Sequence, residues 1–423
     1  MTTLQEAPPA QARRLALEAV RARLWASSLT RYTLYLYLAS RLLYLVIAAV
    51  SMALVDTLGS HTGIAGAHTW EGTLLWHSTL ATEMSNWDGK WYLMTAAQWY
   101  YHHVAMGAGQ YTTLGFMPLY PMAMWLLAHL LPIGDFGAGL AISMVGGGVA
   151  TVLMAKLAEQ WWGEERARRA IALWCVFPGT VVFSMVYSEG LTLALIAATM
   201  LLLQRRRWLW AGVCAGFATA VAPVALSAVP MCAVAALLEL RRRGWRDRPA
   251  RRALLAPLLA PAGAIGFGIY LWIWTGSPLS DYTAQHVEWS ESSTPLAVPR
   301  VAIQLVRELF VSGVGSHGPG GVDLNNAAAL AGTAFLLWGF KLLWEHRARV
   351  PGTAWTWTVC VSVLALTSAK TPPNPRLLVV AFPLVLAVGA ALRPRAYRRA
   401  LGWTLLATLV MTPLTYIGMW LRP

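Results

Sequence analysis

The stretch NWDGKWYLMTAAQWYY (residues 86–101) and, after a short Gly-containing break, YTTLGFMPLYP (residues 111–121) form an island of polar and aromatic residues between long apolar runs. The first part contains Asp88, Lys90 and a block of Trp and Tyr residues, and the second ends in a turn bounded by two prolines. Polar chemistry concentrated at one place in an apolar chain predicts that the fold is organised around this stretch and that a functional site lies there.

The apolar runs on either side decide the class of protein. The 423 residues are 57% hydrophobic and only 12% charged, which is more apolar surface than a soluble domain of this length can bury. A hydrocarbon core about 30 Å thick needs about 20 apolar residues per helix, and the runs approach this length. The strict alternation of a membrane barrel is absent. We therefore predict an all-α polytopic membrane protein with a single integral membrane domain over residues 1–423.

The predicted domain divides into five parts in chain order. A first span over 32–55 is followed by an outer loop with the motif over 56–115, membrane helices over 116–275, a second outer loop over 276–322 and C-terminal membrane helices over 323–419. An interfacial helix is expected over 299–314, where apolar residues at helical spacing alternate with charges. The apolar runs after the first span are 116–131, 138–158, 169–186, 190–204, 208–222, 224–240, 253–274, 323–344, 352–368, 377–392 and 401–419.

The formal net charge of +14 predicts how the chain is oriented in the membrane. The arginines fall in short clusters between apolar runs, which is typical of cytoplasmic loops and excludes a soluble nucleic-acid-binding module. With the Arg-bearing N-terminus in the cytoplasm, counting every run as a span would place the clusters at 166–169 and 205–207 outside. We therefore expect the Pro-bounded run 116–131 to enter and return on the outer side, which leaves about eleven spans.

Arg41 is a charge inside the first predicted span. A charged side chain at the centre of a bilayer costs at least about 2.5 kcal/mol. Because Arg41 stands only about two turns into the run, we expect its side chain to reach the cytoplasmic interface, and the alternative is a side chain that faces the protein interior.

The predicted topology gathers further polar groups on the outer side. They come from the loops at 187–190 (YSEG), 276–325 and 369–376 (AKTPPNPR). A carboxylate in a mainly apolar setting suits a general base, and an Arg fork matches phosphate oxygens. Glu189 stands at a predicted helix start, where the helix dipole alone would account for a carboxylate, so a binding role and a structural role stay open.

The Trp and Tyr residues around Asp88 also have two interpretations. They form either an aromatic belt at the membrane boundary or platforms for sugar rings and lipid headgroups.

No cofactor is expected, and no ligand motif supports a divalent metal. His102 and His103 are adjacent, without a second ligand at helical spacing, and the loop contains neither HExxH nor DxD. The four cysteines lie inside apolar runs without CxxC spacing, which indicates packing residues.

Two motifs resemble the signature of a known family. Trp87-Asp88-Gly89-x-Trp91-Tyr92, followed by Phe116-Met117-Pro118-Leu119-Tyr120-Pro121, is similar to the signature of the PIG-V family, the GPI mannosyltransferase 2 type with many bacterial relatives. The resemblance continues in the same order along most of the chain, through Phe177-Pro178, Tyr187-Ser188-Glu189, Gly276-Ser277-Pro278-Leu279 with Gln285 and Trp289, Pro375-Arg376 and Phe382-Pro383.

This resemblance implies a GT-C glycosyltransferase that takes mannose from a polyprenyl-phosphate carrier, with Asp88 in the first outer loop as catalytic base. We expect an inverting enzyme of a bacterial plasma membrane with its site outside and a lipid or glycan acceptor. Arg376 or Lys370 is expected to stabilise the leaving lipid phosphate. The expected substrate-binding residues are Trp87, Lys90, Trp91, Tyr92, Tyr120, Tyr187, Glu189, Gln285, His286, Trp289, Lys370 and Arg376.

One departure keeps other functions open. Relatives often carry Arg before the Pro of the sixth span, where this chain has Ala222 before Pro223. A membrane scaffold whose site has decayed is therefore an alternative. A transporter or lipid flippase is another, although such proteins usually show internal repeats, and none stands out in this sequence.

Overall fold

The computed structural model describes residues 28–62, 67–68, 74–75, 80–100, 112–310, 323–370, 372–417 and 421–422. The first half contains α2 (Ser28–Thr62), β1 (Ala67–His68), β2 (Leu74–Leu75), α3 (Leu80–Met84), α4 (Asp88–Gln98), the 3-10 helix η1 (Thr113–Gly115), α5 (Leu119–Leu130), α6 (Gly134–Trp162), α7 (Glu164–Cys175), η2 (Pro178–Ser184), α8 (Glu189–Gln204) and α9 (Trp208–Val221). The second half contains η3 (Pro223–Ser227), α10 (Ala228–Arg243), α11 (Arg248–Arg251), η4 (Arg252–Leu254), α12 (Leu255–Leu259), α13 (Ala262–Thr275), α14 (Ser280–Thr283), the π-helix η5 (Ala284–Glu288), α15 (Ala297–Phe310), α16 (Leu324–Glu345), α17 (Gly352–Thr367), α18 (Pro375–Val380), α19 (Phe382–Ala391) and α20 (Pro394–Ile417).

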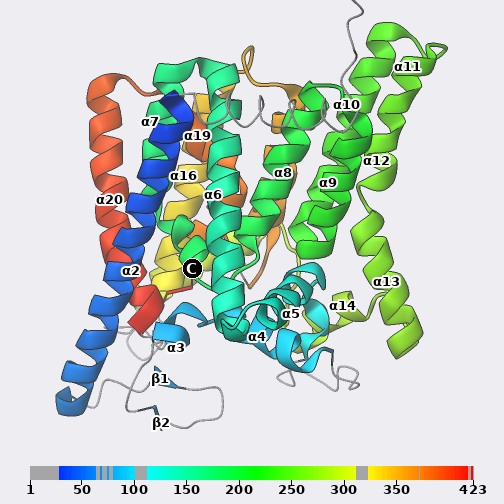
Figure 1. The fold of residues 1–423 in the computed structure, drawn as a ribbon. Helices are drawn as coiled ribbons and strands as arrows, with labels where there is room; N and C mark the ends of the chain where they lie inside the picture. Colours follow the sequence, from blue (N-terminus) through cyan, green and yellow to red (C-terminus); the bar gives the residue numbers. More distant parts are fainter. Residues whose placement is uncertain are drawn as a thin grey trace, which may run out of the picture.

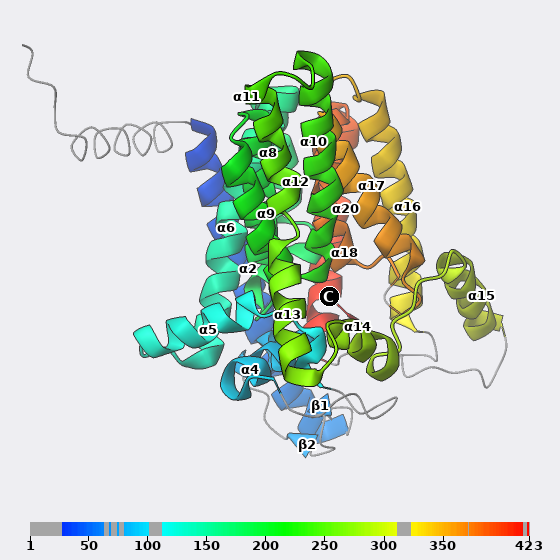
Figure 2. The same ribbon diagram turned by 90° about the vertical axis from the view of Figure 1, so that its right-hand side faces the viewer.

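The long helices form a bundle that runs between two opposite ends (Figure 1). The short helices α3, α4, α5 and α14 lie at one end, which we call the α4 end, together with the small antiparallel pair β1–β2. Helix α15 projects sideways from the same end (Figure 2).

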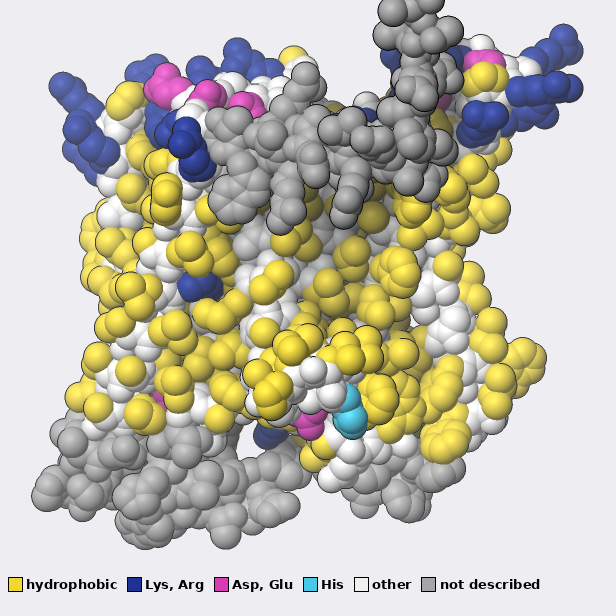
Figure 3. All heavy atoms as spheres, viewed as in Figure 1, with side chains coloured by type: hydrophobic (Ala, Val, Ile, Leu, Met, Phe, Trp, Pro, Cys, Tyr) yellow, Lys and Arg dark blue, Asp and Glu magenta, His cyan; other side chains and the backbone are white. Residues whose placement is uncertain are grey.

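Apolar side chains cover the sides of the bundle, whereas Lys and Arg gather at the end opposite to α4, over α20 and α11 (Figure 3). Among the described residues, four segments are long and apolar enough to cross a membrane: 28–54 in α2, α6, 223–243 with α10, and α16. Two bent pairs, η2 with α8 and the segment 248–259 with α13, would raise this number to six. The protein is therefore a multi-pass integral membrane protein, and the eleven predicted spans stay a prediction.

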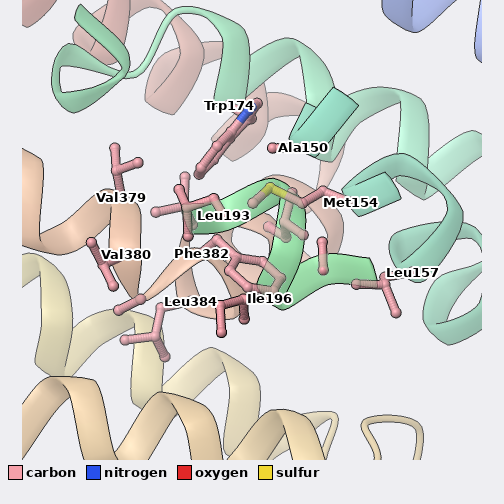
Figure 4. Close-up of a cluster of buried hydrophobic side chains, with 14 of the residues drawn as sticks. Ala150, Met154, Leu157, Trp174, Leu193, Ile196, Val379, Val380, Phe382 and Leu384 are labelled. Atoms are coloured by element: carbon pink, nitrogen blue, oxygen red, sulfur yellow. The ribbon is translucent and has the colours of Figure 1, made fainter. Parts of the chain in front are cut away.

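Helix α19 forms the centre of the bundle. Its residues from Phe382 to Ala390 are all buried, as expected for a helix that is apolar on every side. It packs against side chains of α6, α7 and α8, including Met154, Trp174 and Ile196 (Figure 4). This part of the core thus joins helices from the middle of the chain to a helix near its C-terminal end.

Several of the predicted apolar runs are not single helices in the structure. The run 169–186 divides into α7 and η2 before Pro178, and the run 377–392 divides into α18 and α19 next to Pro383. Proline lacks the backbone N–H that a continuing helix needs, so each break follows from the sequence. Helix α5 has 12 residues, about 18 Å, and this length fits the prediction that the run 116–131 does not cross.

The first outer loop also differs from its predicted form. Helix α2 continues to Thr62, beyond the predicted end of the span at residue 55. The motif at Asp88 belongs to helix α4 instead of an irregular loop. His102 and His103 lie outside the described residues.

Arg41 does not reach an interface, so that prediction was wrong and the alternative holds. Its side chain is 3% exposed and donates to Thr180 O at 2.7 Å and to Ser184 Oγ at 3.1 Å, both in η2. The rings of Tyr37 and Tyr44 lie 4.9 and 4.6 Å from its guanidinium carbon. These contacts satisfy the buried charge inside the bundle and tie α2 to η2.

Candidate active site

Asp88, Glu189 and Arg376 meet at the α4 end of the bundle. The guanidinium of Arg376 donates from Nη1 to Asp88 Oδ2 and from Nε to Glu189 Oε1. Asp88 and Arg376 stand 288 residues apart in the chain, and Glu189 and Arg376 stand 187 apart. The fold thus brings three of the predicted residues together, and we call them the Asp88 group.

Each member of the group stands at the start of a helix. Asp88 opens α4 and Glu189 opens α8, where unpaired backbone N–H groups and the helix dipole favour a carboxylate. Arg376 follows Pro375, whose fixed φ suits the first position of α18. Asn374 caps this helix by accepting a backbone N–H of its first turn at 2.9 Å.

The Asp88 group is open on one side. The side chains of Asp88 and Arg376 are 29% and 26% exposed, whereas that of Glu189 is 8% exposed. Glu189 Oε2 is buried and has no hydrogen-bond partner within the part of the chain that the structure describes. Leaving a buried acceptor unpaired is costly, so a hydroxyl of a bound molecule would gain a hydrogen bond there.

Tyr187 and Trp87 fix the backbone that leads into α4. The Tyr187 hydroxyl accepts from Asp88 N at 3.1 Å and donates to Asn86 O at 3.3 Å, and its ring lies 4.9 Å from Arg376 Cζ. Trp87 has a φ of 63°, in the left-handed region that side chains rarely adopt. Such strain costs about 1–3 kcal/mol and is found at functional sites, where the surrounding contacts maintain it.

The other aromatic residues of the motif pack beneath the Asp88 group. Trp91, Tyr92 and Tyr120 are 4%, 5% and 0% exposed. The Tyr92 hydroxyl shares a 2.8 Å hydrogen bond with Ser188 Oγ, and the Tyr120 hydroxyl donates to a backbone carbonyl of α6 at 2.9 Å. These rings support α4 from the core, and their direct contact with a substrate stays a prediction.

The π-helix η5 and the residue after it join the second outer loop to the motif. Gln285 Nε2 donates to Gly115 O at 2.9 Å, and the Trp289 ring centroid lies 5.0 Å from that of Trp91. His286 is exposed and its Nδ1 pairs with a backbone carbonyl at 2.8 Å. Among the described residues, no hydrogen bond or ion pair joins His286 to the Asp88 group, so the fold does not bring it together with them.

Glu288 is a further link that the sequence motifs did not single out. It is 1% exposed and accepts from Thr112 N at 2.6 Å and from Thr112 Oγ1 at 2.9 Å. Burial raises the pKa of its carboxyl group, while the hydrogen bonds from Thr112 oppose this rise. In the sequence, Glu288 is distinguished only as a charged residue next to Trp289.

The two predicted lysines lie near aromatic rings. Lys90 Nζ is 5.7 Å from the Trp91 ring centroid, and burial lowers its pKa while the charge of Asp88 opposes the shift. Lys370 Nζ donates to Trp289 O and lies 5.8 Å from the Trp289 ring centroid. Burial contributes most to the lowered pKa of Lys370. An anion bound beside either lysine would stabilise its charged form.

Arg422, at the end of the chain, was missed by the sequence analysis. Its Nη1 donates to Lys370 O at 3.1 Å, and its guanidinium carbon lies 5.9 Å from the Trp87 ring centroid. Its backbone N–H donates to Asn325 Oδ1 at 2.9 Å. No local pattern marks this residue, because only the packing of α20 brings the chain end to the α4 end.

The site offers no preformed metal centre among the residues that can be described. No group of three or more His, Cys, Asp or Glu side chains lies close enough to hold an ion in those parts of the chain. In the Asp88 group one guanidinium instead pairs with two carboxylates and leaves one negative charge in excess, which suits proton transfer and hydroxyl binding.

Two apolar clefts lie on the bundle, and no residue of the Asp88 group lines either of them. One, of about 670 Å³, lies between α4 and α5 and is lined by residues that include Trp99, Met122 and Trp125. The other, of about 330 Å³, lies between α16 and α20 and reaches Pro375, the neighbour of Arg376. Both are lined mainly by hydrophobic side chains, as expected for the binding of lipid chains.

No protein-family model and no curated protein matches the chain. Solved structures match the chain at low sequence identity and with TM-scores below 0.5. ArnT from Cupriavidus metallidurans bound to undecaprenyl phosphate has a TM-score of 0.49 and 13% identity, over 89% of this chain and 74% of that chain. The apo state of the same protein has a TM-score of 0.45 and 16% identity, over 73% of this chain and 55% of that chain.

The oligosaccharyltransferase of Archaeoglobus fulgidus in the apo form has a TM-score of 0.40 and 14% identity, over 89% of this chain and 56% of that chain. This chain therefore spans little more than half the length of two of these structures. The PIG-V resemblance and the use of mannose stay predictions.

Proposed function

We propose that the protein is a GT-C glycosyltransferase that transfers mannose from a polyprenyl-phosphate-mannose donor to a lipid-linked or extracytoplasmic acceptor. The observation that carries this proposal is the Asp88 group, in which a partly exposed carboxylate is held by an arginine at the end of a membrane bundle. The motif resemblance implies mannose as the sugar and a polyprenyl phosphate as its carrier. The two apolar clefts are of a kind that binds lipid chains.

In the proposed reaction, Asp88 acts as general base. The acceptor hydroxyl oxygen attacks the anomeric carbon of the donor, and the bond from that carbon to the phosphate oxygen breaks. The hydroxyl proton passes to a carboxylate oxygen of Asp88, and the electron pair of the broken bond leaves with the lipid phosphate. This single displacement inverts the anomeric centre.

Arg376 and Glu189 support this role of Asp88. The Arg376 fork binds one oxygen of each carboxylate and so fixes the orientation of Asp88. Glu189 Oε2, buried and unpaired among the described residues, would accept a hydrogen bond from a hydroxyl of a bound sugar. A sugar ring held there would lie beside the base.

The proposal places the site on the extracytoplasmic side of a plasma membrane. Its support is the distribution of charge, because Lys and Arg gather at the end of the bundle opposite to α4 (Figure 3). About eleven spans, with α5 on the outer side, belong to the same proposal.

A transfer assay with matched variants tests the proposal. Purified protein is given radiolabelled undecaprenyl-phosphate mannose and a panel of bacterial lipids as acceptors. Asp88→Asn is expected to lower kcat by about 100-fold or more, because it removes the base and keeps the shape. Asp135→Asn changes another carboxylate in the first turn of a helix and should keep the wild-type rate.

A wild-type rate in Asp88→Asn would exclude Asp88 as the base. Movement of the labelled lipid across proteoliposome membranes without transfer to any acceptor would favour the lipid flippase instead.

A further inference from the structure

The cations near Asp88 differ in the groups that already engage them. Arg376 is bound by two carboxylates, Asp88 and Glu189. When all three are ionised, this group has one more negative charge than positive charge. A phosphate that approached Arg376 would therefore meet repulsion from the same carboxylates that hold the guanidinium.

Lys370 and Arg422 form a second, adjacent cationic pair with different partners. Arg422 Nη1 donates to the backbone carbonyl of Lys370 at 3.1 Å, and Lys370 Nζ donates to the backbone carbonyl of Trp289. Within the described part of the chain, these neutral acceptors take up one side-chain N–H of each cation and leave the other donors for another ligand. Glu291, the carboxylate near Lys370, accepts from Ser368 Oγ at 3.2 Å.

Arg422 is built into the fold and lies over the ring of the residue that precedes the proposed base. Arg422 is anchored through its backbone to Asn325, and the preceding Leu421 is 3% exposed. The guanidinium carbon lies 5.9 Å from the ring centroid of Trp87, the residue before Asp88. This is within the range of a cation–π contact. Both cations are partly exposed, so a ligand can reach them.

Like charges placed together favour an anion between them. Burial lowers the pKa of Lys370 most, the carboxylate of Glu291 opposes this, and the charge of Arg422 lowers the pKa further. The negative charge of a bound phosphate would compensate for the lost hydration of Lys370 and for its repulsion by Arg422. Arg presents a planar fork and Lys a compact charge, and the two together suit the oxygens of one phosphate.

We propose that Lys370 and Arg422 bind the phosphate group of a polyprenyl-phosphate carrier, an inference that rests on the proposed glycosyl transfer. Arg376 then serves as a positioning residue for Asp88, and the departing phosphate is received by the pair. The last residues of the chain thereby become part of the donor site.

Binding of undecaprenyl phosphate to the purified full chain in detergent tests this inference. Arg422→Gln and Lys370→Gln are each expected to weaken binding by about tenfold to a hundredfold, since each removes a charged hydrogen-bond donor. Arg347→Gln is the matched control, because Arg347 also lies over a Trp ring, at 4.9 Å, and donates to a backbone carbonyl at 3.2 Å. It should bind as the wild type does.

Three further ligands identify the source of the phosphate. Undecaprenol, which lacks the phosphate, should bind weakly and equally to all variants. Inorganic phosphate should compete with the carrier only at much higher concentration, and phosphatidylglycerol should bind without regard to Arg422. Equal loss of phosphatidylglycerol binding in Arg422→Gln would mean a general anionic-lipid contact and would overturn the inference.

Three other results would also overturn the inference. They are unchanged carrier binding in both Arg422→Gln and Lys370→Gln, an equal loss of binding in Arg347→Gln, and no carrier binding by the wild type. The result of the carrier-binding experiment can be distinguished from the result of the transfer assay. If the carrier binds through Lys370 and Arg422 but no sugar is transferred from any donor, the inference stands and the glycosyltransferase proposal fails.

Discussion

Arg376 links two carboxylates that lie far apart in the chain, and its role depends on the geometry of its fork. The guanidinium reaches Asp88 from Nη1 and Glu189 from Nε at the same time. A lysine ammonium is a single point of charge and cannot reproduce this bidentate arrangement. Substitution of Arg376 by Lys therefore shows whether the site needs the orientation that the fork gives to Asp88 or only a positive charge.

We expect Arg376→Lys to lower kcat about tenfold or more, with the KM for the donor nearly unchanged. Steady-state kinetics with the mannosyl donor measures both constants. Arg168→Lys is the control, since Arg168 contacts Glu164 at 2.8 Å in an exposed pair on α7. A rise in KM with kcat unchanged would instead assign Arg376 to the donor phosphate.

Arg41 provides a second prediction at this scale. Arg41→Lys keeps a buried charge but loses the fork that binds Thr180 and Ser184. Each lost bond to a charged group is worth about 1.5–3 kcal/mol, so the thermal midpoint in detergent should fall by several degrees. Arg31→Lys, at an exposed position of the same helix, should leave the midpoint unchanged. An unchanged midpoint in Arg41→Lys would mean that the fork does not stabilise the fold.

At the scale of elements, the close approach of α6 and α8 positions Glu189. Gly190 follows Glu189 at the start of α8 and faces α6. A Cβ atom at this position would lie 2.9 Å from Gly147 N and closer still to Ser143 O. Both neighbours are backbone atoms of a long helix, so they cannot move aside cheaply.

Gly190→Ala is therefore expected to destabilise the protein by about 1–3 kcal/mol and to lower transfer activity, because α8 must shift together with Glu189. Gly266→Ala is the matched control in α13, where nothing lies within 4 Å of the added methyl group. It should be neutral or stabilising by up to about 1 kcal/mol. Thermal unfolding in detergent compares the two, and an equal effect would argue against the close packing.

At the scale of the whole molecule, the two ends of the bundle should face opposite sides of the membrane. The structure guides the choice of reporter positions, since Tyr187 is fully buried and would not report accessibility. His286 is exposed at the α4 end, and Arg241 in the last turn of α10 and Arg395 in the first turn of α20 are exposed as well.

On a background without the four native cysteines, His286→Cys should react with an impermeant thiol reagent added outside intact cells. Arg241→Cys and Arg395→Cys should react only after the cytoplasm is opened. Labelling of position 286 from the cytoplasm alone would reverse the orientation and place the Asp88 group inside.

The sequence by itself determined the class of the protein, and it included Asp88, Glu189 and Arg376 in a longer set of candidate site residues. A chain that is 57% hydrophobic with arginines between apolar runs has to be a membrane bundle of helices. Asp88, Glu189 and Arg376 were recognisable because a charge in an apolar chain is costly and so marks a site.

Only the tertiary structure decided how these residues are joined. The contact between Asp88 and Arg376 spans 288 residues, and no local pattern encodes it. The fold also buries the aromatic residues Trp91 and Tyr92 of the motif and places the side chain of Arg41 inside the bundle. It brings the guanidinium of Arg422 to the ring of Trp87. Hydropathy and residue spacing indicate which secondary structure and which environment each segment prefers. Contacts between residues far apart in the chain depend instead on which helices pack together.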